Sequence, residues 1–373
     1  MSLKQLVEIS RFYGTNPEYI LAGGGNTSWK NRDTLYVKSS GTSLAEASQD
    51  TFVKIDRKAL AHIWEKQYPE TSDERESAVL SDMMAARRSG EEMKRPSVET
   101  LLHDILPFAF AAHLHPALVN GLTCAIRGEE AMREIFGNEP IWIPSVSPGY
   151  ILCGLVKKAT DAYNKEYHKN ASVIFMQNHG IFVGADSVDG IKEQYNGIMF
   201  KIGGRIKRRP DLSGLTLAAG SKTSGNIRVI AGVLTELSGN AVFMCGGGID
   251  ALVKDRSSFA PVSSAFTPDH IVYSGGDPLF TDALEETGIR YAWKNHTRKT
   301  GRNPKVIAVQ GLGVFGAAET EKASYLALDL FKDTIKVAIY AESFGGPLFM
   351  TQEQIDFINN WEAERFRSGI SEQ

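Results

Sequence analysis

Three of the eight histidines are spaced so that they could share one metal ion. His113 and His115 lie two residues apart in the run 108–115, whose apolar composition is typical of a strand. Successive side chains of a strand point to opposite faces, so both imidazoles would project from one face. His179 follows a second apolar run, 173–176, at the start of a turn. Three imidazoles would leave a zinc ion one open position, which is the usual design of a catalytic site.

A carboxylate near such an ion would complete a site for acid–base chemistry. Glu99 precedes His113 by fourteen residues and lies near the start of an expected helix, 98–106. Near a metal it could act as a general base, and such proton transfer typically accelerates a reaction by about 10²–10⁴-fold. The spacing alone favours a simpler role, in which an acid in the first turn complements the helix dipole. A lone histidine is likewise more often a structural hydrogen-bonding group than a ligand, so the hypothesis depends on the whole set.

Two loops have the composition of phosphate-binding turns. The first, 23–28, has three glycines followed by an amide and two hydroxyls, and the second, 39–42, follows a short expected strand, 35–38. Backbone N–H groups and hydroxyls of such turns suit a phosphate monoester, and a lysine adds positive charge. Either loop alone is weak support, since ordinary turns share this composition. The candidate phosphate-binding residues of the two loops are Asn26, Thr27, Ser28, Lys38, Ser40, Gly41 and Thr42.

A third glycine pattern, Gly311-x-Gly313-x-x-Gly316, matches the dinucleotide-binding motif after an expected strand, 306–309. A dinucleotide site also requires a return strand that ends near an acidic residue about 20 residues further on. A helical pattern instead continues over 319–342, so the sequence does not favour a nicotinamide site.

Composition excludes several classes of protein. The 373 residues include 41 basic and 44 acidic side chains, which give a formal net charge of −3. This balance does not fit a generally basic nucleic-acid binder, and no apolar run is long enough to predict a membrane span. The first residues lack a secretory signal pattern, and three scattered cysteines are typical of free thiols in a reducing compartment. We therefore expect a cytoplasmic protein that binds neither nucleic acid nor membrane.

The elements that would position these residues alternate between strands and helices, which predicts an α/β fold. A Gly/Ser/Thr-rich stretch in 203–226 is expected to be a linker, with a boundary near residue 215. The sequence thus predicts a metal-dependent domain over 1–215 and a smaller α/β domain over 216–373.

The second domain contains an echo of the first. Segment 306–341 repeats the pattern of 173–206 at a constant offset, and both are expected to form a buried strand, a glycine turn and an amphipathic helix. Chance similarity between such common units is an equally good explanation. If the echo reflects a degenerate partial repeat, Leu312 takes the position of His179 and the second copy lacks that ligand.

Five short motifs occur in a characteristic order along the first part of the chain. They are G-N-T-S at 25–28, K-S-S-G-T at 38–42, R-P-S-V-E at 95–99, H-L-H-P at 113–116 and N-H-G at 178–180. With these motifs in this order, the chain resembles the class II aldolase/adducin family over residues 23–206. Residues 220–373 resemble, less specifically, the segment that follows the aldolase part of bifunctional rhamnulose-1-phosphate aldolase/dehydrogenases, at D-H-I-V-Y (269–273) and G-R-N-P-K (301–305). The short-chain dehydrogenase domain that would come next is expected to be absent.

The resemblance implies a fold, a metal and roles for the residues. The family fold is a three-layer α/β/α domain, commonly assembled as a tetramer with active sites at subunit interfaces. The resemblance implies that His113, His115 and His179 bind Zn²⁺, although imidazole also suits other divalent metals. Glu99 would be the catalytic acid/base, and Ser97 would join the two loops in holding the substrate phosphate.

The implied activity is zinc-dependent cleavage of a ketose 1-phosphate, such as rhamnulose 1-phosphate, to dihydroxyacetone phosphate and an aldehyde through an enediolate. Ser145 stands where the fuculose-phosphate aldolases place a tyrosine proton donor, and Val98 stands in place of a serine, so protonation of the aldehyde oxygen is unassigned. The same metal chemistry also serves epimerases, dehydratases and decarboxylases on this scaffold. A non-catalytic, adducin-like interaction module is less favoured, because its catalytically silent relatives lack the three histidines.

Overall fold

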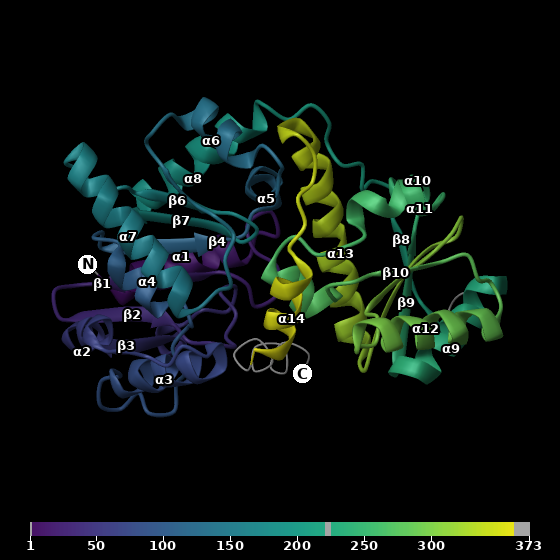
Figure 1. Ribbon diagram of the computed structural model, residues 1–373, viewed down its shortest axis with the longest axis horizontal. Helices are drawn as coiled ribbons and strands as arrows, with labels where there is room; N and C mark the ends of the chain where they lie inside the picture. Colours follow the sequence, from purple (N-terminus) through teal and green to yellow (C-terminus); the bar gives the residue numbers. More distant parts are fainter. Residues whose placement is uncertain (1, 221–224, 362–373) are drawn as a thin grey trace. The chain divides into compact units, whose positions relative to one another are not determined.

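The computed structural model describes residues 2–220 and 225–361, which form two compact units (Figure 1). Unit 1 takes in most of the chain up to residue 205, and unit 2 takes in 206–360 together with 124–126. Residues 206–215, which the sequence pattern places in the first domain, fall in unit 2. Part of the expected linker, 221–224, lies outside the described residues.

Unit 1 is built on a seven-stranded sheet in the order β3-β2-β1-β4-β7-β6-β5. Neighbouring strands run antiparallel, except that β5 and β6 are parallel. The central strands are short apolar runs that are almost wholly buried, as their composition predicts. The strands are β1 Asn26–Lys30, β2 Thr34–Lys38, β3 Phe52–Asp56, β4 Phe110–Leu114, β5 Ile141–Ile143, β6 Val173–Met176 and β7 Gly180–Ala185.

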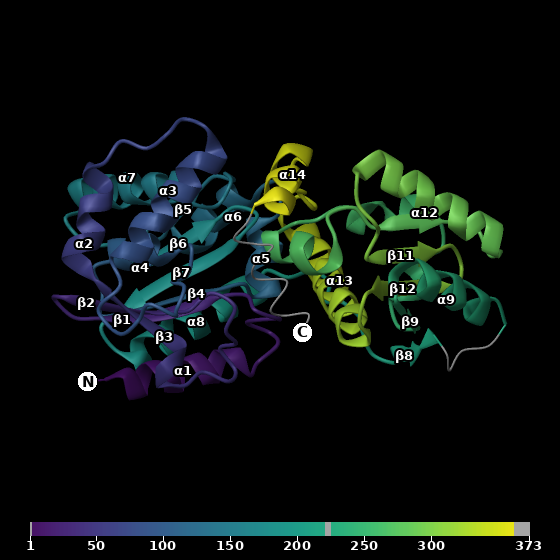
Figure 2. The same ribbon diagram turned by 90° about the horizontal axis from the view of Figure 1, so that it is seen from below.

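Helices cover both faces of this sheet, which confirms the three-layer α/β/α arrangement (Figure 2). Helices α1 and α8 pack on one face against β1, β4 and β7, and α3, α4 and α7 pack together on the other. The hydroxyl of Ser187 caps α8 by accepting a hydrogen bond from the backbone N–H of Gly190 (3.0 Å). The helices are α1 Leu3–Gly14, α2 Arg57–Ala61, α3 Ser72–Ala85, α4 Thr100–Ile105, α5 Ala117–Thr123, α6 Gly128–Phe136, α7 Tyr150–Tyr167 and α8 Val188–Gly203, with short turns η1 Gln49–Thr51 and η2 His62–Glu65.

Unit 2 has a five-stranded sheet in the order β10-β11-β12-β9-β8. Its strands are β8 Thr216–Ala219, β9 Asn240–Cys245, β10 Leu279–Thr281, β11 Val306–Val309 and β12 Gly313–Ala318. In its core, Ile230 and Leu234 of α9 and Trp293 of α12 pack with buried residues of the sheet. The helices are α9 Gly225–Ser238, α10 Ile249–Leu252, α11 Arg256–Phe259, α12 Glu286–Thr300, α13 Glu321–Ala341 and α14 Gln352–Asn360, with short turns η4 Ala260–Val262, η5 His270–Ser274 and η6 Glu342–Phe344.

The five strands of unit 2 have the same spatial order and directions as five of the seven strands of unit 1. The order β10-β11-β12-β9-β8 has the same parallel and antiparallel pairings as β5-β6-β7-β4-β1. Segments 173–206 and 306–341 are each a β-hairpin followed by a helix, with the same strand register. The sequence pattern predicts a glycine turn that leads straight into the helix. A second strand intervenes instead, because the apolar residues after each turn pair back onto the first strand.

Two further details differ from the expectation. The Gly/Ser/Thr-rich stretch expected to be a linker contains β8, which pairs with β9. The G-x-G-x-x-G pattern lies in the turn and second strand of the β11–β12 hairpin, and not between a strand and a helix as a dinucleotide site requires. None of the helices in the described ranges is long and apolar enough to cross a membrane.

Candidate metal centre

The three histidines come together where β4 ends and β6 turns into β7. His113 lies on β4 and His115 follows that strand, and His179 lies in the β6–β7 turn. One nitrogen of each ring lies within 4.8 Å of the others, and the Nε2 atoms of His113 and His115 are 2.8 Å apart. His113 and His179 are buried, and His115 is partly buried. The structure therefore gathers the residues that the sequence singled out as metal ligands.

The backbone around His179 brings the hairpin close to the other two rings. Asn178 has a positive φ of 56°, a conformation that asparagine tolerates better than most residues. Gly180 follows, and a Cβ atom there would lie 2.6 Å from Cδ2 of His115 and 3.3 Å from Cε1 of His113. The glycine of the N-H-G motif is thus required by the close approach of the His115 ring and of the backbone carbonyl oxygen of Leu114, 2.7 Å from such a Cβ atom.

His113 presents its Nε2 atom to the cluster in a fixed orientation. Its Nδ1 lies 3.0 Å from the carbonyl oxygen of Ile181, which can only accept a hydrogen bond, so Nδ1 donates to it and Nε2 faces the cluster. The ring also stacks on Phe182, with ring centroids 4.3 Å apart. A hydrogen bond that orients the ring in this way is usual for a metal-binding histidine.

Glu99 directs its carboxylate at the histidines from the N-terminal end of α4, the helix expected over 98–106. Its Oε1 lies 3.2 Å from Nε2 of both His113 and His179, and its Oε2 accepts a hydrogen bond from Nδ2 of Asn26 (2.6 Å). Burial by itself raises the pKa of Glu99, but the imidazoles of His113 and His179 outweigh it and hold the pKa well below its usual value. The carboxylate is thus ionised and aimed at the point where the imidazoles meet.

This donor set fits a divalent metal ion. Oε1 of Glu99 is buried beside Nε2 of His113 and His179 and makes no well-aligned hydrogen bond to the described residues, so a cation held by the imidazoles would lie next to its negative charge. Three imidazoles with an ionised carboxylate beside them are ligands that suit zinc and related divalent metals. Such a site can polarise a substrate oxygen and move a proton next to it.

The two glycine-containing loops lie beside Glu99. The ammonium group of Lys38 donates to the carbonyl oxygen of Gly23 (3.2 Å), which joins the second loop to the first. The backbone N–H of Ser97 donates to the carbonyl of Lys38 (3.3 Å), and Nδ2 of Asn26 lies 3.3 Å from the Ser97 hydroxyl. Asn26, Lys38 and Ser97 are therefore neighbours of one another, although they are far apart in sequence.

The remaining loop residues form a tight turn. The backbone N–H of Ser40 donates to the carbonyl of Arg95 (2.8 Å), Gly41 has a positive φ of 81°, and the Thr42 hydroxyl donates to the carbonyl of Ser39 (2.8 Å). The Ser39 hydroxyl is buried and has no hydrogen-bond partner within the described part of the chain, and the sequence did not single it out.

Thr27 and Ser28 direct their hydroxyls to opposite faces of the sheet. Oγ1 of Thr27 lies 2.6 Å from Oγ of Ser10 on α1, and Oγ of Ser28 lies 2.7 Å from Nδ1 of His103 on α4. The alternation of side chains along a strand explains this difference. The two hydroxyls cannot serve the same ligand.

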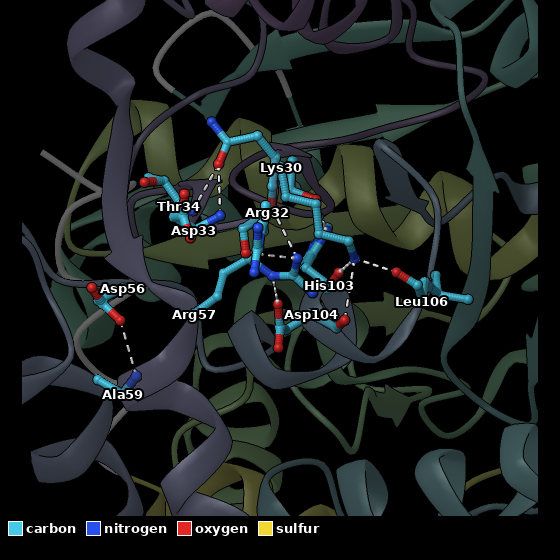
Figure 3. A network of polar contacts seen from close by, with 12 residues as sticks. Lys30, Arg32, Asp33, Thr34, Asp56, Arg57, Ala59, His103, Asp104 and Leu106 are labelled. Atoms are coloured by element: carbon cyan, nitrogen blue, oxygen red, sulfur yellow. Dashed lines mark hydrogen bonds and ion pairs between the residues drawn. The ribbon is translucent and has the colours of Figure 1, made fainter.

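The face of β1 that carries Asn26 and Ser28 also carries Lys30, which the sequence did not single out. Its ammonium group donates to the carbonyl oxygens of His103, Asp104 (3.2 Å) and Leu106 at the C-terminal end of α4 (Figure 3). Burial lowers the pKa of Lys30 to about 7. Two features of the sequence could have pointed to Lys30. Asn26, Ser28 and Lys30 have the period-two spacing of residues on one face of a strand, and His103 lies four residues after Glu99, on the same side of a helix.

Comparison with known proteins identifies a family. The family model described as "Class II Aldolase and Adducin N-terminal domain" matches residues 4–196, which is more than half of the chain. A curated relative, Uncharacterized oxidoreductase YuxG of Bacillus subtilis (strain 168), is 22% identical over an alignment of 410 positions that covers 98% of this chain. The chain spans 58% of the length of that relative.

Several solved structures are similar to about half of this chain. The N-terminal class II aldolase domain of a conserved protein from Thermoplasma acidophilum is 26% identical and covers 55% of this chain and 93% of its own, with a TM-score of 0.46. L-Fuculose-1-phosphate aldolase from Thermus thermophilus is 14% identical and covers 54% of this chain and 92% of its own, with a TM-score of 0.35.

Proposed function

Because this chain belongs to the class II aldolase and adducin family, we propose that unit 1 is a zinc-dependent aldolase that cleaves a ketose 1-phosphate. The observation that carries the proposal is the position of Glu99, whose Oε1 lies 3.2 Å from Nε2 of both His113 and His179. A proton-transfer group beside metal ligands is what carbon–carbon cleavage through an enediolate requires. The substrate we propose is L-rhamnulose 1-phosphate, with dihydroxyacetone phosphate and an aldehyde as products.

The residues divide the chemistry between them. A divalent ion held by His113, His115 and His179 would supply Lewis-acid stabilisation of negative charge on the substrate oxygens, an effect worth several kcal/mol. In the synthetic direction, ionised Glu99 removes a proton from the donor carbon of dihydroxyacetone phosphate. In the cleavage direction, the carboxylate must first take up the proton that the C4 hydroxyl releases, and it then delivers a proton to the donor carbon after the C3–C4 bond has broken.

The phosphate group is proposed to bind at the two joined loops. Lys38 supplies positive charge, Asn26 and Ser97 supply polar groups next to Glu99, and the turn at 40–42 supplies the backbone N–H of Gly41. The buried hydroxyl of Ser39, which has no hydrogen-bond partner among the described residues, supports a polar ligand in this place.

The direct test is an assay of L-rhamnulose 1-phosphate cleavage, measured as dihydroxyacetone phosphate formed, before and after removal of metal with a chelator. We expect cleavage that the chelator abolishes and added Zn²⁺ restores. Metal-loaded protein that cleaves no ketose 1-phosphate would contradict the aldolase and favour an epimerase, a dehydratase or a decarboxylase. Protein that binds no metal would favour an adducin-like interaction module.

Replacement of the proposed base separates chemistry from metal binding. Glu99→Gln keeps the size of the side chain but cannot accept the proton, so kcat should fall by about 10²–10⁴-fold. Metal content, measured by elemental analysis, should stay at one ion per chain. A variant with full activity would contradict the role of Glu99. The homo-oligomer that the resemblance implies, with the tetramer common in the family, and the cytoplasmic location expected from the composition stay predictions.

A further inference from the structure

His103 lies at the centre of a buried chain of hydrogen bonds that ends at Glu99. Its Nδ1 lies 2.7 Å from the Ser28 hydroxyl, and its Nε2 lies within hydrogen-bond distance of Oδ1 of Asn26. Nδ2 of the same amide donates to Oε2 of Glu99 at 2.6 Å. His103 is completely buried, and Asn26 and Glu99 are nearly so.

The chemistry of each group fixes the direction of this chain. Oδ1 of Asn26 can only accept, so Nε2 of His103 carries the proton and Nδ1 accepts from the Ser28 hydroxyl. The nitrogen of the same amide donates to Glu99, which leaves the oxygen facing His103. The order is therefore hydroxyl to imidazole, imidazole to amide, and amide to carboxylate.

The surroundings of His103 hold it neutral and in place. Burial lowers its pKa to about 3, so the ring does not take up a proton near neutral pH. Its ring also packs edge-on against Phe182, with centroids 5.0 Å apart, and Phe182 stacks on His113. A neutral ring with one fixed tautomer can hold the Asn26 amide in a single orientation.

We propose that His103 is a positioning residue, which acts through Asn26 to hold Oε2 of Glu99 and so turns Oε1 toward the metal ligands. This inference rests on the proposed function of Glu99 as the acid/base. His103 does not contact the substrate. It fixes the rotation of the carboxylate, so that only one of the two oxygens exchanges the proton.

Two amide variants of different length form a matched pair. His103→Gln places an amide nitrogen near the position of Nε2 and can still donate to Asn26, whereas His103→Asn places its amide near Nδ1 and cannot reach. We expect His103→Asn to lower kcat by about 10- to 100-fold with little change in KM, as losses of such supporting hydrogen bonds typically do. His103→Gln should keep kcat close to that of the original enzyme.

Two controls make the comparison specific. Metal content and melting temperature are measured for both variants, since equal values exclude a general loss of structure. Hydrogen–deuterium exchange of dihydroxyacetone phosphate in D₂O isolates the proton transfer at Glu99 and should fall in His103→Asn alone. Equal activity of the two variants, or equal loss in both, would overturn the proposal.

A measurement that does not depend on activity distinguishes failure of this proposal from failure of the proposed function. In ¹⁵N-histidine-labelled full-length protein, the His103 signals, assigned by their loss in His103→Gln, should show a neutral ring protonated at Nε2 at pH 7. A ring protonated at Nδ1 or at both nitrogens would refute the inference, whatever the enzyme does. If the ring is neutral and protonated at Nε2 but no ketose 1-phosphate is cleaved, the hydrogen-bond chain stands and the aldolase assignment fails.

Discussion

At the scale of single residues, the close approach at Gly180 gives a sharp prediction about metal affinity. A Cβ atom there would lie 2.6 Å from the His115 ring and 2.7 Å from the carbonyl oxygen of Leu114, which cannot move without the strand. Gly180→Ala should therefore displace the ligand set and weaken Zn²⁺ binding by about 10- to 100-fold, the range typical of disturbed ligand support. Isothermal titration of metal-free protein with Zn²⁺ measures the change.

Gly154→Ala is the matched control for this substitution. Gly154 lies in α7, and a Cβ atom there would contact nothing within 4 Å. The control should leave Zn²⁺ affinity unchanged and, because alanine is the better helix former, should slightly stabilise the protein. If Gly180→Ala binds Zn²⁺ as tightly as the control does, the close approach has no role in holding the ligands.

Individual residue types made part of the site predictable from the sequence. The H-x-H spacing predicts that His113 and His115 lie on the same side of the chain, because strand alternation is a local signal. The role of Asn26 could not be read in the same way. Its partner Glu99 lies 73 residues away, and their contact exists only because β1 packs against α4.

At the scale of elements, the contact between β1 and α4 predicts an unusual dependence of stability on pH. Burial lowers the pKa of Lys30 in the folded protein to about 7, whereas an unfolded chain would have the ordinary value near 10.4. Between these values the unfolded chain binds one proton more than the folded chain, so the free energy of unfolding rises with pH. The cost of keeping Lys30 buried is full below pH 7 and is lost as pH approaches 10.

Replacement of Lys30 tests whether this residue causes the pH dependence of stability. Lys30→Met removes the titrating group, so the unfolding free energy of the original protein should rise relative to the variant by about 1 kcal/mol per pH unit between pH 7.5 and 9. Urea unfolding at fixed protein concentration measures the difference. Lys58→Met is the control, since the Lys58 side chain is exposed on α2, and the pH profile of this variant should parallel that of the original protein. Parallel pH profiles for the original protein and Lys30→Met would contradict the assignment.

Element boundaries were less predictable than element types. The strands over 35–38 and 173–176 and the helix that starts near 188 follow directly from apolar spacing. The second strand of each hairpin does not follow from the sequence. Its residues are also compatible with a turn or the start of a helix, and only pairing with the preceding strand defines them as a strand. Strand β8 in the expected linker is likewise defined by its pairing with β9, since its small residues carry little signal.

At the scale of the whole molecule, the shared strand connections show which positions of unit 2 correspond to the metal site of unit 1. Phe182 pairs with His113 across β7 and β4, and Phe315 pairs with Phe243 across β12 and β9. The two hairpins have the same register, so Phe243 corresponds to His113. By the same register, Cys245 and Leu312 correspond to His115 and His179, and Ala218 corresponds to Asn26.

None of these unit 2 side chains provides an imidazole or a carboxylate, and the described residues contain no second group of three metal-ligating side chains besides the histidines. We therefore expect one tightly bound metal ion per chain, held by unit 1 alone. The full-length triple variant with His113, His115 and His179 replaced by alanine should bind none, whereas Cys245→Ser should still bind one. Elemental analysis after dialysis against metal-free buffer measures both, and a full equivalent of metal retained by the triple variant would place a metal site elsewhere in the chain.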